Sequence, residues 1–306
     1  YKEIEFEVMR DSTDHAITIC GMENIDPVGV HTGDSLVVAP IMTLSKEDEK
    51  MLNDSAIKLI RELKIEGGCN VQFALNPETS EYYLIEVNPR VSRSSALASK
   101  ASGYPIARVT AKIAVGMSLE EIAIANTNAA FEPRLDYTIA KLPRFPFDKF
   151  ASAANTLGTQ MKATGEIMGI GSTLEECLLK GVRSLEIGVC HFHMAKFDHK
   201  STEEMLQYLH AFQDDNIFAV AELLRRGISV EKLHEVTQIT SFFLEAIERI
   251  VKMETVVREN VGDFETLKKA KTMGFGDKFI SQLWGWKEID VYNLRKDNNF
   301  FPVYRM

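Results

Sequence analysis

The chain has 306 residues, a mass of 34.4 kDa and a formal net charge of −9 at pH 7. At roughly 100–200 residues per domain this length predicts two domains, and 45% hydrophobic with 26% charged residues is typical of a folded globular protein. These values exclude a largely disordered or collagen-like chain, and no apolar run approaches the ~20 residues that span a bilayer. We therefore predict no membrane span, and the acidic balance predicts no general binding to nucleic acid.

Strand-like and helix-like segments are mixed in the first 186 residues. Residues 2–8 alternate between charged and apolar side chains, and a D-S-T-D turn separates them from a second alternating run at 15–20, which predicts a β-hairpin. Ser45 with Asp48 is typical of a helix start, and an apolar stripe follows it to residue 63. Further strands are predicted at 35–39, 70–75, 83–87 and 136–142. Further helices are predicted at 94–102, 105–116, 118–125 and 172–185.

Almost every segment after residue 186 has a helical pattern. Helices are predicted at 202–212, 217–226, 230–236, 241–259, 264–273, 277–283 and 288–295. Glycines fall between several of these segments, where they act as helix stop signals, and Ser229 and Asp263 stand at N-cap positions. We therefore predict an α+β domain over residues 1–186, with an antiparallel sheet and flanking helices, followed by an all-α domain over residues 187–306.

Three oxygen-bearing side chains form the first candidate site. Glu86 and Asn88 are two residues apart at the end of a predicted strand, so their side chains share a face. Gln72 lies on the preceding strand and stands beside Glu86 if the two strands pair as an antiparallel hairpin. Hard oxygen donors in such a group suit Mg²⁺ or Mn²⁺ holding nucleotide phosphates. The alternative is that these residues have no binding role and the strand simply ends in solvent. On spacing alone this alternative is favoured, because E-x-N is short and common.

Arg90 and Arg93 follow directly, before the serine-rich start of a predicted helix. Guanidinium groups beside free backbone N–H groups at a helix start form an anion pocket, for which phosphate, carboxylate and bicarbonate are candidate ligands. The alternative is a solvated charged loop. The adjacent E-x-N pattern favours the functional interpretation.

Two further segments carry weaker signals. Glu3 lies with Glu5 and Glu7 on one face of the first strand, where a carboxylate accepts hydrogen bonds from a ribose or simply forms a polar strand face. Two glycines bracket His31 in the segment 29–35, which indicates close approach of the backbone to a ligand, although a single loop histidine is more often structural.

The cysteine and histidine patterns indicate a cytoplasmic protein without a zinc site. The histidines at 191, 193 and 199 lack a second cluster that would complete four zinc ligands. No secretory signal is visible, and because the chain starts with Tyr1 rather than Met we expect it to begin inside a longer polypeptide or after processing. The cysteines show no paired spacing and are interpreted as reduced thiols: Cys20, Cys69, Cys177 and Cys190.

Several of these segments together resemble the large subunit of carbamoyl phosphate synthetase. The most specific is the run L-I-E-V-N-P-R-V-S-R-S-S-A-L-A-S-K-A at 84–101. The segments at 23–24, 29–35, 70–74, 131–133, 136–137, 161–162 and 165–166 match as well, and the helical part matches more weakly. Biotin carboxylases share only the looser E-x-N-x-R core of the long run, which argues against them, although another ATP-grasp ligase of that kind stays an alternative.

The resemblance implies a particular part of that enzyme. Its large subunit has two ATP-grasp halves, the first forming carboxyphosphate from bicarbonate and the second phosphorylating carbamate, with a helical oligomerisation domain between them. This chain resembles the C-terminal part of the first ATP-grasp unit followed by the oligomerisation domain. The implied cofactors are ATP and two Mg²⁺ or Mn²⁺ ions, with K⁺ as a further candidate.

The resemblance also implies roles for individual residues. Arg90 and Arg93 would hold bicarbonate or the phosphoryl group, and Asn24 and Ser35 would help form a monovalent-cation site. The metal ligands would be Gln72, Glu86 and Asn88. The ATP contacts would be Glu3, Gly29, Val30, His31, Gln72 and Glu86.

The implied partners are bicarbonate, ammonia, a glutaminase small subunit or domain, and the upstream and downstream parts of the same large subunit. The glycine-rich loop that covers the phosphates in ATP-grasp enzymes is not found in this chain, so we expect no bicarbonate activation by the chain alone. A hypothesis from a different class is an interaction module, in which the helical part buries an apolar face in a homo-oligomer.

Overall fold

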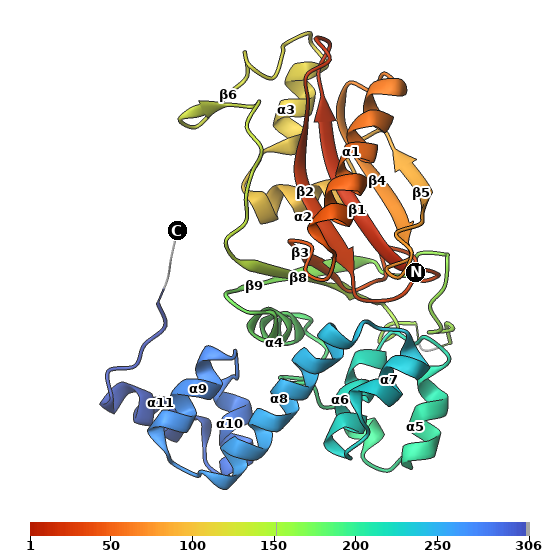
Figure 1. The fold of residues 1–306 in the computed structure, drawn as a ribbon. Helices are drawn as coiled ribbons and strands as arrows, with labels where there is room; N and C mark the ends of the chain where they lie inside the picture. Colours follow the sequence, from red (N-terminus) through yellow and green to blue (C-terminus); the bar gives the residue numbers. More distant parts are fainter. Residues whose placement is uncertain (151, 304–306) are drawn as a thin grey trace. The chain divides into compact units, whose positions relative to one another are not determined.

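The computed structural model describes residues 1–150 and 152–303, which form two compact units (Figure 1). Unit 1 comprises Tyr1–Pro143 with Thr159–Met161, and unit 2 comprises Arg144–Gly158 with Lys162–Met306. The predicted domain boundary at residue 186 lies inside unit 2 and stays a prediction. None of the helices in the described ranges is long and apolar enough to cross a membrane.

Unit 1 is an antiparallel sheet with helices on both faces, as predicted. The strand order is β5-β4-β1-β2-β3-β8, and the hairpins β1–β2 and β4–β5 both form. The larger strands are β1 (Lys2–Arg10), β2 (Ala16–Asn24), β4 (Gly67–Leu75), β5 (Tyr82–Asn88) and β8 (Thr138–Arg144). The smaller elements and helices are β3 (Val37–Ala39), β6 (Ala123–Ile124), β7 (Thr127–Asn128), α1 (Lys46–Glu62), α2 (Arg93–Ser102) and α3 (Ile106–Ile113).

The alternation of β1 directs its apolar residues to one face of the sheet. Ile4, Phe6 and Val8 pack there with the β4 residues opposite them and with the apolar stripe of α1. Ser45 caps α1 as predicted, since its side chain accepts a hydrogen bond from the Asp48 N–H. Burying each large apolar side chain stabilises this layer by roughly 1.5–3 kcal/mol.

The glutamate face of β1 is buried too, which the polar pattern did not predict. Glu3, Glu5 and Glu7 are each less than 5% exposed. Serines at the start of α2 contact Glu5 and Glu7, and Thr32 contacts Glu3. Ser95, on α2, donates a hydrogen bond of 2.9 Å to Glu7. The sheet therefore separates an apolar layer on the α1 side from a polar, solvent-poor layer on the α2 side.

Unit 2 is mainly helical. Its strand β9 (Gly165–Gly171) packs directly on α4 (Leu174–Ser184). The two backbones are so close that a Cβ at Gly169 would lie 2.0 Å from the Cys177 carbonyl oxygen. The remaining elements are η1 (Ala195–Phe197), α5 (Thr202–Leu209), α6 (Asn216–Arg225), α7 (Val230–Thr237), α8 (Ser241–Glu259), α9 (Phe264–Thr272), α10 (Asp277–Trp284) and α11 (Glu288–Asp297). All seven helices predicted after residue 200 are present.

A buried ionic cluster joins the helices of unit 2. Arg225 of α6 donates two hydrogen bonds, of 2.7 and 2.8 Å, to the Glu254 carboxylate of α8. His191 contacts the same carboxylate at 3.0 Å and stacks on Phe279. This histidine is therefore part of the interior of unit 2. All four cysteines lie within the described residues, and none of them forms a disulfide.

One predicted helix is wrong. Residues 118–125 form a turn that leads into the short β6–β7 hairpin. This turn is tied to the end of the β1 strand because the Leu119 N–H donates to Asp11, the residue that follows β1, at 2.7 Å. Ala125 has a positive φ of 44°, which no right-handed helix allows. Strand β9 was not predicted, since its three glycines weaken the strand pattern.

Candidate functional site

Two polar rows cross three strands on the α2 side of the sheet. In the first row Glu5 of β1 is opposite Gln72 of β4, and Gln72 is opposite Glu86 of β5. In the second row Glu7 is opposite Asn70, and Asn70 is opposite Asn88. Directly opposed residues have Cβ atoms about 5 Å apart, so the predicted juxtaposition of Gln72 and Glu86 is present.

The outer end of these rows is a chain of hydrogen bonds. Asn88 donates to Glu86 at 2.7 Å, and Arg90 donates to the Asn88 side-chain oxygen at 3.2 Å. Glu86 and Arg90 are exposed, whereas Gln72 is 7% exposed and donates to Asn70 at 2.9 Å. Carboxylate and amide oxygens thus meet at an accessible sheet edge, and this donor set suits a hard divalent cation.

Helix α2 begins beside this edge. Its N-cap Ser92 accepts a hydrogen bond from the Ser95 N–H, and the Ser95 hydroxyl accepts one from the Ser92 N–H. This capping box holds Arg93 as the first helical residue, at the helix end where the backbone N–H groups point outward. A helix start with Arg90 and Arg93 close by in the chain is a site that attracts anionic oxygens.

The segment 29–35 folds onto the same layer. The Thr32 hydroxyl donates to the Glu3 carboxylate and lies 3.4 Å from the Gln72 side-chain oxygen. Buried Lys141 of β8 donates to the Thr32 carbonyl at 2.8 Å and so ties the segment to the sheet. The His31 ring accepts a hydrogen bond of 2.9 Å from the Gly33 N–H.

Two predicted ATP contacts in this segment, Gly29 and Val30, differ in how exposed they are. Gly29 has a φ of +119° and open space where a Cβ would stand, so the backbone is accessible there. Val30, in contrast, is 5% exposed.

Burial shifts the titration of the glutamates on this layer. It raises the pKa of Glu3 from 4.5 to about 7, although the Thr32 hydroxyl opposes the shift. It raises the pKa of Glu7 to about 8 and also raises that of Glu5, against the effect of the Lys141 ammonium. Since neutral carboxyls dominate below these values, the layer holds protons at pH 6 that an exposed glutamate would have released.

Buried polar atoms without hydrogen-bond partners indicate a second candidate binding site. Among the described residues, the side-chain oxygen and nitrogen of Asn24 and the hydroxyl of Ser35 are buried without a hydrogen-bond partner. These two residues come close together because the Ile25 N–H donates to the Leu36 carbonyl at 2.8 Å. Unsatisfied buried oxygens are costly, and a bound cation would satisfy them.

The sequence-predicted residues therefore fall into one connected region. Glu3, Gln72, Glu86 and Asn88 lie on one sheet face. The segment that carries His31 reaches this face through Thr32. Sequence reasoning missed Thr32, Lys141 and Asn70. The N-x-Q alternation around Gln72 was a usable signal for Asn70, whereas nothing local indicates that Lys141 lies under residues 32 and 33.

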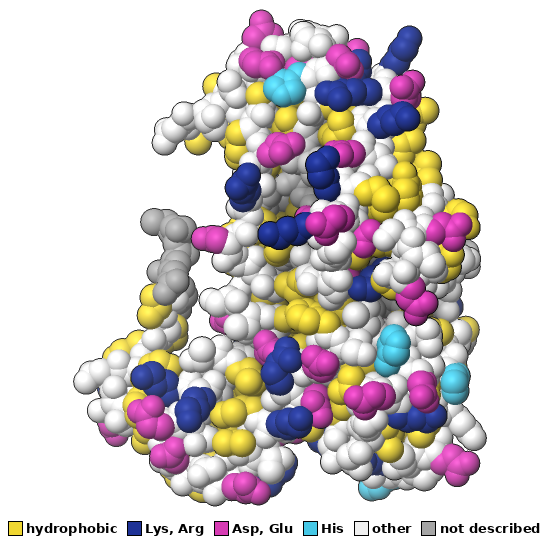
Figure 2. Space-filling model, viewed as in Figure 1, with side chains coloured by type: hydrophobic (Ala, Val, Ile, Leu, Met, Phe, Trp, Pro, Cys, Tyr) yellow, Lys and Arg dark blue, Asp and Glu magenta, His cyan; other side chains and the backbone are white. Residues whose placement is uncertain are grey.

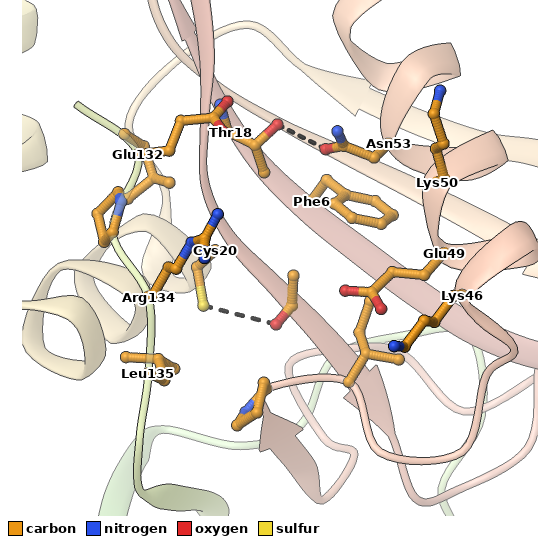
Figure 3. Close-up of a pocket in the computed structure, with 15 residues that line it drawn as sticks. Phe6, Thr18, Cys20, Lys46, Glu49, Lys50, Asn53, Glu132, Arg134 and Leu135 are labelled. Carbon is orange, nitrogen blue, oxygen red and sulfur yellow. Dashed lines mark hydrogen bonds between the residues drawn. The ribbon is translucent and has the colours of Figure 1, made fainter. Parts of the chain in front are cut away.

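A separate cavity of about 550 Å³ lies between α1, β2 and residues 132–135 (Figure 3). Arg134 and Glu49 point into it, and Thr18 hydrogen-bonds to Asn53 at its rim. It contains none of the predicted site residues. On the face seen in Figure 2, basic and acidic side chains are interspersed over the described residues, without an extended patch of one sign.

Comparison with known proteins identifies the two parts of the chain. A model described as the ATP-binding domain of the carbamoyl-phosphate synthase L chain matches residues 1–122. A model described as the oligomerisation domain of the carbamoyl-phosphate synthetase large chain matches residues 166–299. The chain thus matches two domains of the same large chain. It belongs to the carbamoyl-phosphate synthetase large-chain family.

Solved structures that show a partial likeness to this chain include biotin carboxylase domains and pyruvate carboxylases. The biotin carboxylase domain of a single-chain bacterial carboxylase is 20% identical over 46% of this chain and 32% of its own, with a TM-score of 0.39. Rhizobium etli pyruvate carboxylase T882A, crystallised without acetyl coenzyme A, is 14% identical over 68% of this chain and 25% of its own, with a TM-score of 0.47. The chain spans less than a third of the solved relatives that it matches.

Proposed function

We propose that unit 1 binds ATP together with Mg²⁺ at the outer end of the two polar rows. The observation that carries this proposal is the cross-strand placement of Gln72 opposite Glu86, with Asn88 hydrogen-bonded to the same carboxylate. The match of residues 1–122 to an ATP-binding domain supports it. Gln72, Glu86 and Asn88 would hold two divalent ions, Mg²⁺ or Mn²⁺, and these would neutralise phosphate charge.

The remaining residues of the region would position nucleotide and bicarbonate. Glu3, held by Thr32, would accept hydrogen bonds from the ribose, and the backbone of residues 29–31 would line the nucleotide. Arg90 and Arg93 would hold bicarbonate beside the terminal phosphate, where their fixed charges stabilise negative charge as the phosphoryl group transfers. The partnerless atoms of Asn24 and Ser35 support a K⁺ site next to the nucleotide.

In the complete enzyme this unit would take part in making carbamoyl phosphate. The reaction would use bicarbonate, ammonia released from glutamine by a glutaminase partner, and two ATP, with carboxyphosphate as the first intermediate. The chain would work in the cytoplasm with the other parts of the large subunit, in the arginine or pyrimidine pathway. The biotin carboxylase alternative is disfavoured because both matched family descriptions name carbamoyl-phosphate synthase.

Titration calorimetry with Mg-ATP tests the proposal. We expect binding by the chain and at least about tenfold weaker binding by Glu86→Gln, because the variant removes the proposed carboxylate ligand of the cation. Glu78→Gln, in the turn of the same hairpin, makes the same charge change away from the site and is expected to bind like the unchanged chain. Equal affinity of Glu86→Gln and Glu78→Gln would refute the site.

We further propose that unit 2 mediates self-association, which its match to an oligomerisation domain supports.

Bicarbonate-dependent ATP hydrolysis by the chain alone is expected to be no faster than hydrolysis by the Glu86→Gln variant. If hydrolysis rises above that level, the glycine-rich loop that the family resemblance implies is not needed for the reaction.

A further inference from the structure

Met161 lies between the two parts of the candidate site. Its sulfur is 3.6 Å from the Nη1 atom of Arg93 at the start of α2. The same side chain packs on the segment 29–35, since a Cβ at Gly33 would lie 2.6 Å from the Met161 sulfur. The thioether therefore contacts both the proposed nucleotide segment and an arginine of the proposed anion pocket. Residues 159–161 belong to unit 1, so both contacts are internal to that unit.

Met161 is also the most exposed methionine in the part of the chain that the structure describes. It is 41% exposed, and within residues 1–150 and 152–303 every other methionine is buried or half-buried. Oxidation of a thioether needs access of a peroxide to the sulfur, so exposure selects this residue among the methionines.

We propose that Met161 is a modification site, at which a hydroperoxide converts the thioether to a sulfoxide whose oxygen binds the Arg93 guanidinium. The peroxide O–O bond breaks, one oxygen forms a bond to sulfur, and water leaves when the oxidant is hydrogen peroxide. Sulfur loses two electrons and the peroxide gains them.

The product differs from the thioether in hydrogen bonding. A thioether is a weak acceptor, whereas a sulfoxide oxygen is a strong one and accepts readily from a cationic N–H donor. At the sulfur–nitrogen distance of 3.6 Å, rotation about the terminal bonds of the side chain brings such an oxygen within reach of the guanidinium. The sulfoxide oxygen then competes with an external anion for the Arg93 guanidinium. If the proposed function holds, oxidation weakens the binding of phosphate oxygens at this edge.

The first test follows the chemistry and needs no nucleotide. The full chain is treated with hydrogen peroxide, and methionine oxidation is followed by peptide mass spectrometry. We expect Met161 to oxidise at least about tenfold faster than the buried methionines. In parallel, the Nε–H signal of Arg93 is followed by NMR and assigned with Arg93→Lys. Oxidation is expected to shift this signal in the unchanged chain and to leave it in place in Met161→Leu, which fills the same space without an oxidisable sulfur.

A second variant makes the outcome independent of peroxide damage elsewhere. Met161→Gln carries a carbonyl oxygen near the position of the sulfoxide oxygen and is expected to shift the Arg93 signal without peroxide. An Arg93 signal that is the same in oxidised chain and in peroxide-treated Met161→Leu would overturn the proposal, as would slow oxidation of Met161.

Inorganic phosphate separates this proposal from the proposed function. Phosphate is expected to shift the Arg93 signal in the untreated chain and to do so at about tenfold higher concentration after oxidation. If phosphate leaves the signal of the untreated chain unchanged, the anion pocket is wrong, and the response of Arg93 to oxidation still decides the role of Met161.

Discussion

At the scale of single residues, the buried carboxyl of Glu7 links stability to pH. Burial raises its pKa from 4.5 to about 8, so between these values the folded chain keeps a proton that the unfolded chain has released. Its contribution to stability is complete below pH 4.5 and is lost as pH rises through 8. We expect Glu7→Gln to match the unchanged chain at pH 5 and to exceed its free energy of unfolding at pH 8.5 by a few kcal/mol, since one pKa unit corresponds to ~1.4 kcal/mol.

Urea unfolding at pH 5 and pH 8.5, in a metal-free buffer, measures this effect. Glu62→Gln, at the exposed end of α1, makes the same substitution without burial and is expected to show little change at either pH. A constant difference between Glu7→Gln and the unchanged chain across this range would mean that Glu7 is ionised in the folded state.

The buried glutamates also show where prediction from sequence ended. The pairing of Gln72 with Glu86 follows from two alternating segments and the turn between them, because a hairpin fixes its own register. The burial of Glu7 does not follow, since it depends on α2, about 90 residues further along the chain, covering a face that its own strand pattern marks as polar. Lys141 under Thr32 is a contact of the same long-range kind.

At the scale of elements, the helix N-caps could be predicted from the sequence. The glycine-rich strand β9 and the turn at residues 118–125, whose conformation depends on tertiary contacts, could not. Ser45, Ser229 and Asp263 cap their helices because capping uses only residues within one turn. Residues 118–125 have a helical composition, yet the buried contact of Leu119 with Asp11 draws them into a turn. Local chemistry therefore determined the ends of helices, while packing decided the short segments between them.

The cap of α2 provides a prediction that links an element to the site. Ser92→Ala removes the side-chain acceptor for the Ser95 N–H, which typically costs about 1 kcal/mol of stability. We expect faster amide hydrogen exchange over the first turn of α2 and weaker Mg-ATP binding, because the first turn and Arg93 lose their fixed position. Ser229→Ala removes the equivalent cap of α7 and is the matched control, expected to change exchange in unit 2 and to leave Mg-ATP affinity unaltered. If the two variants bind Mg-ATP with equal affinity, the cap of α2 does not contribute to nucleotide binding.

At the scale of the whole molecule, the chain divides into two compact units, and the two proposed functions fall in different units. All residues of the candidate site belong to unit 1, and the match to an oligomerisation domain falls in unit 2. Each unit has its own buried core, so a change in the site need not reach the helices of unit 2.

This separation predicts that nucleotide binding and self-association are independent. Linkage requires that a ligand which changes association also binds the associated and free chains with different affinity. We expect sedimentation velocity over a concentration series to show self-association with the same constant in the unchanged chain, in Glu86→Gln, and with or without saturating Mg-ATP. A shift of the association constant with Mg-ATP that is absent in Glu86→Gln would instead mean that the site in unit 1 and the surface in unit 2 are coupled.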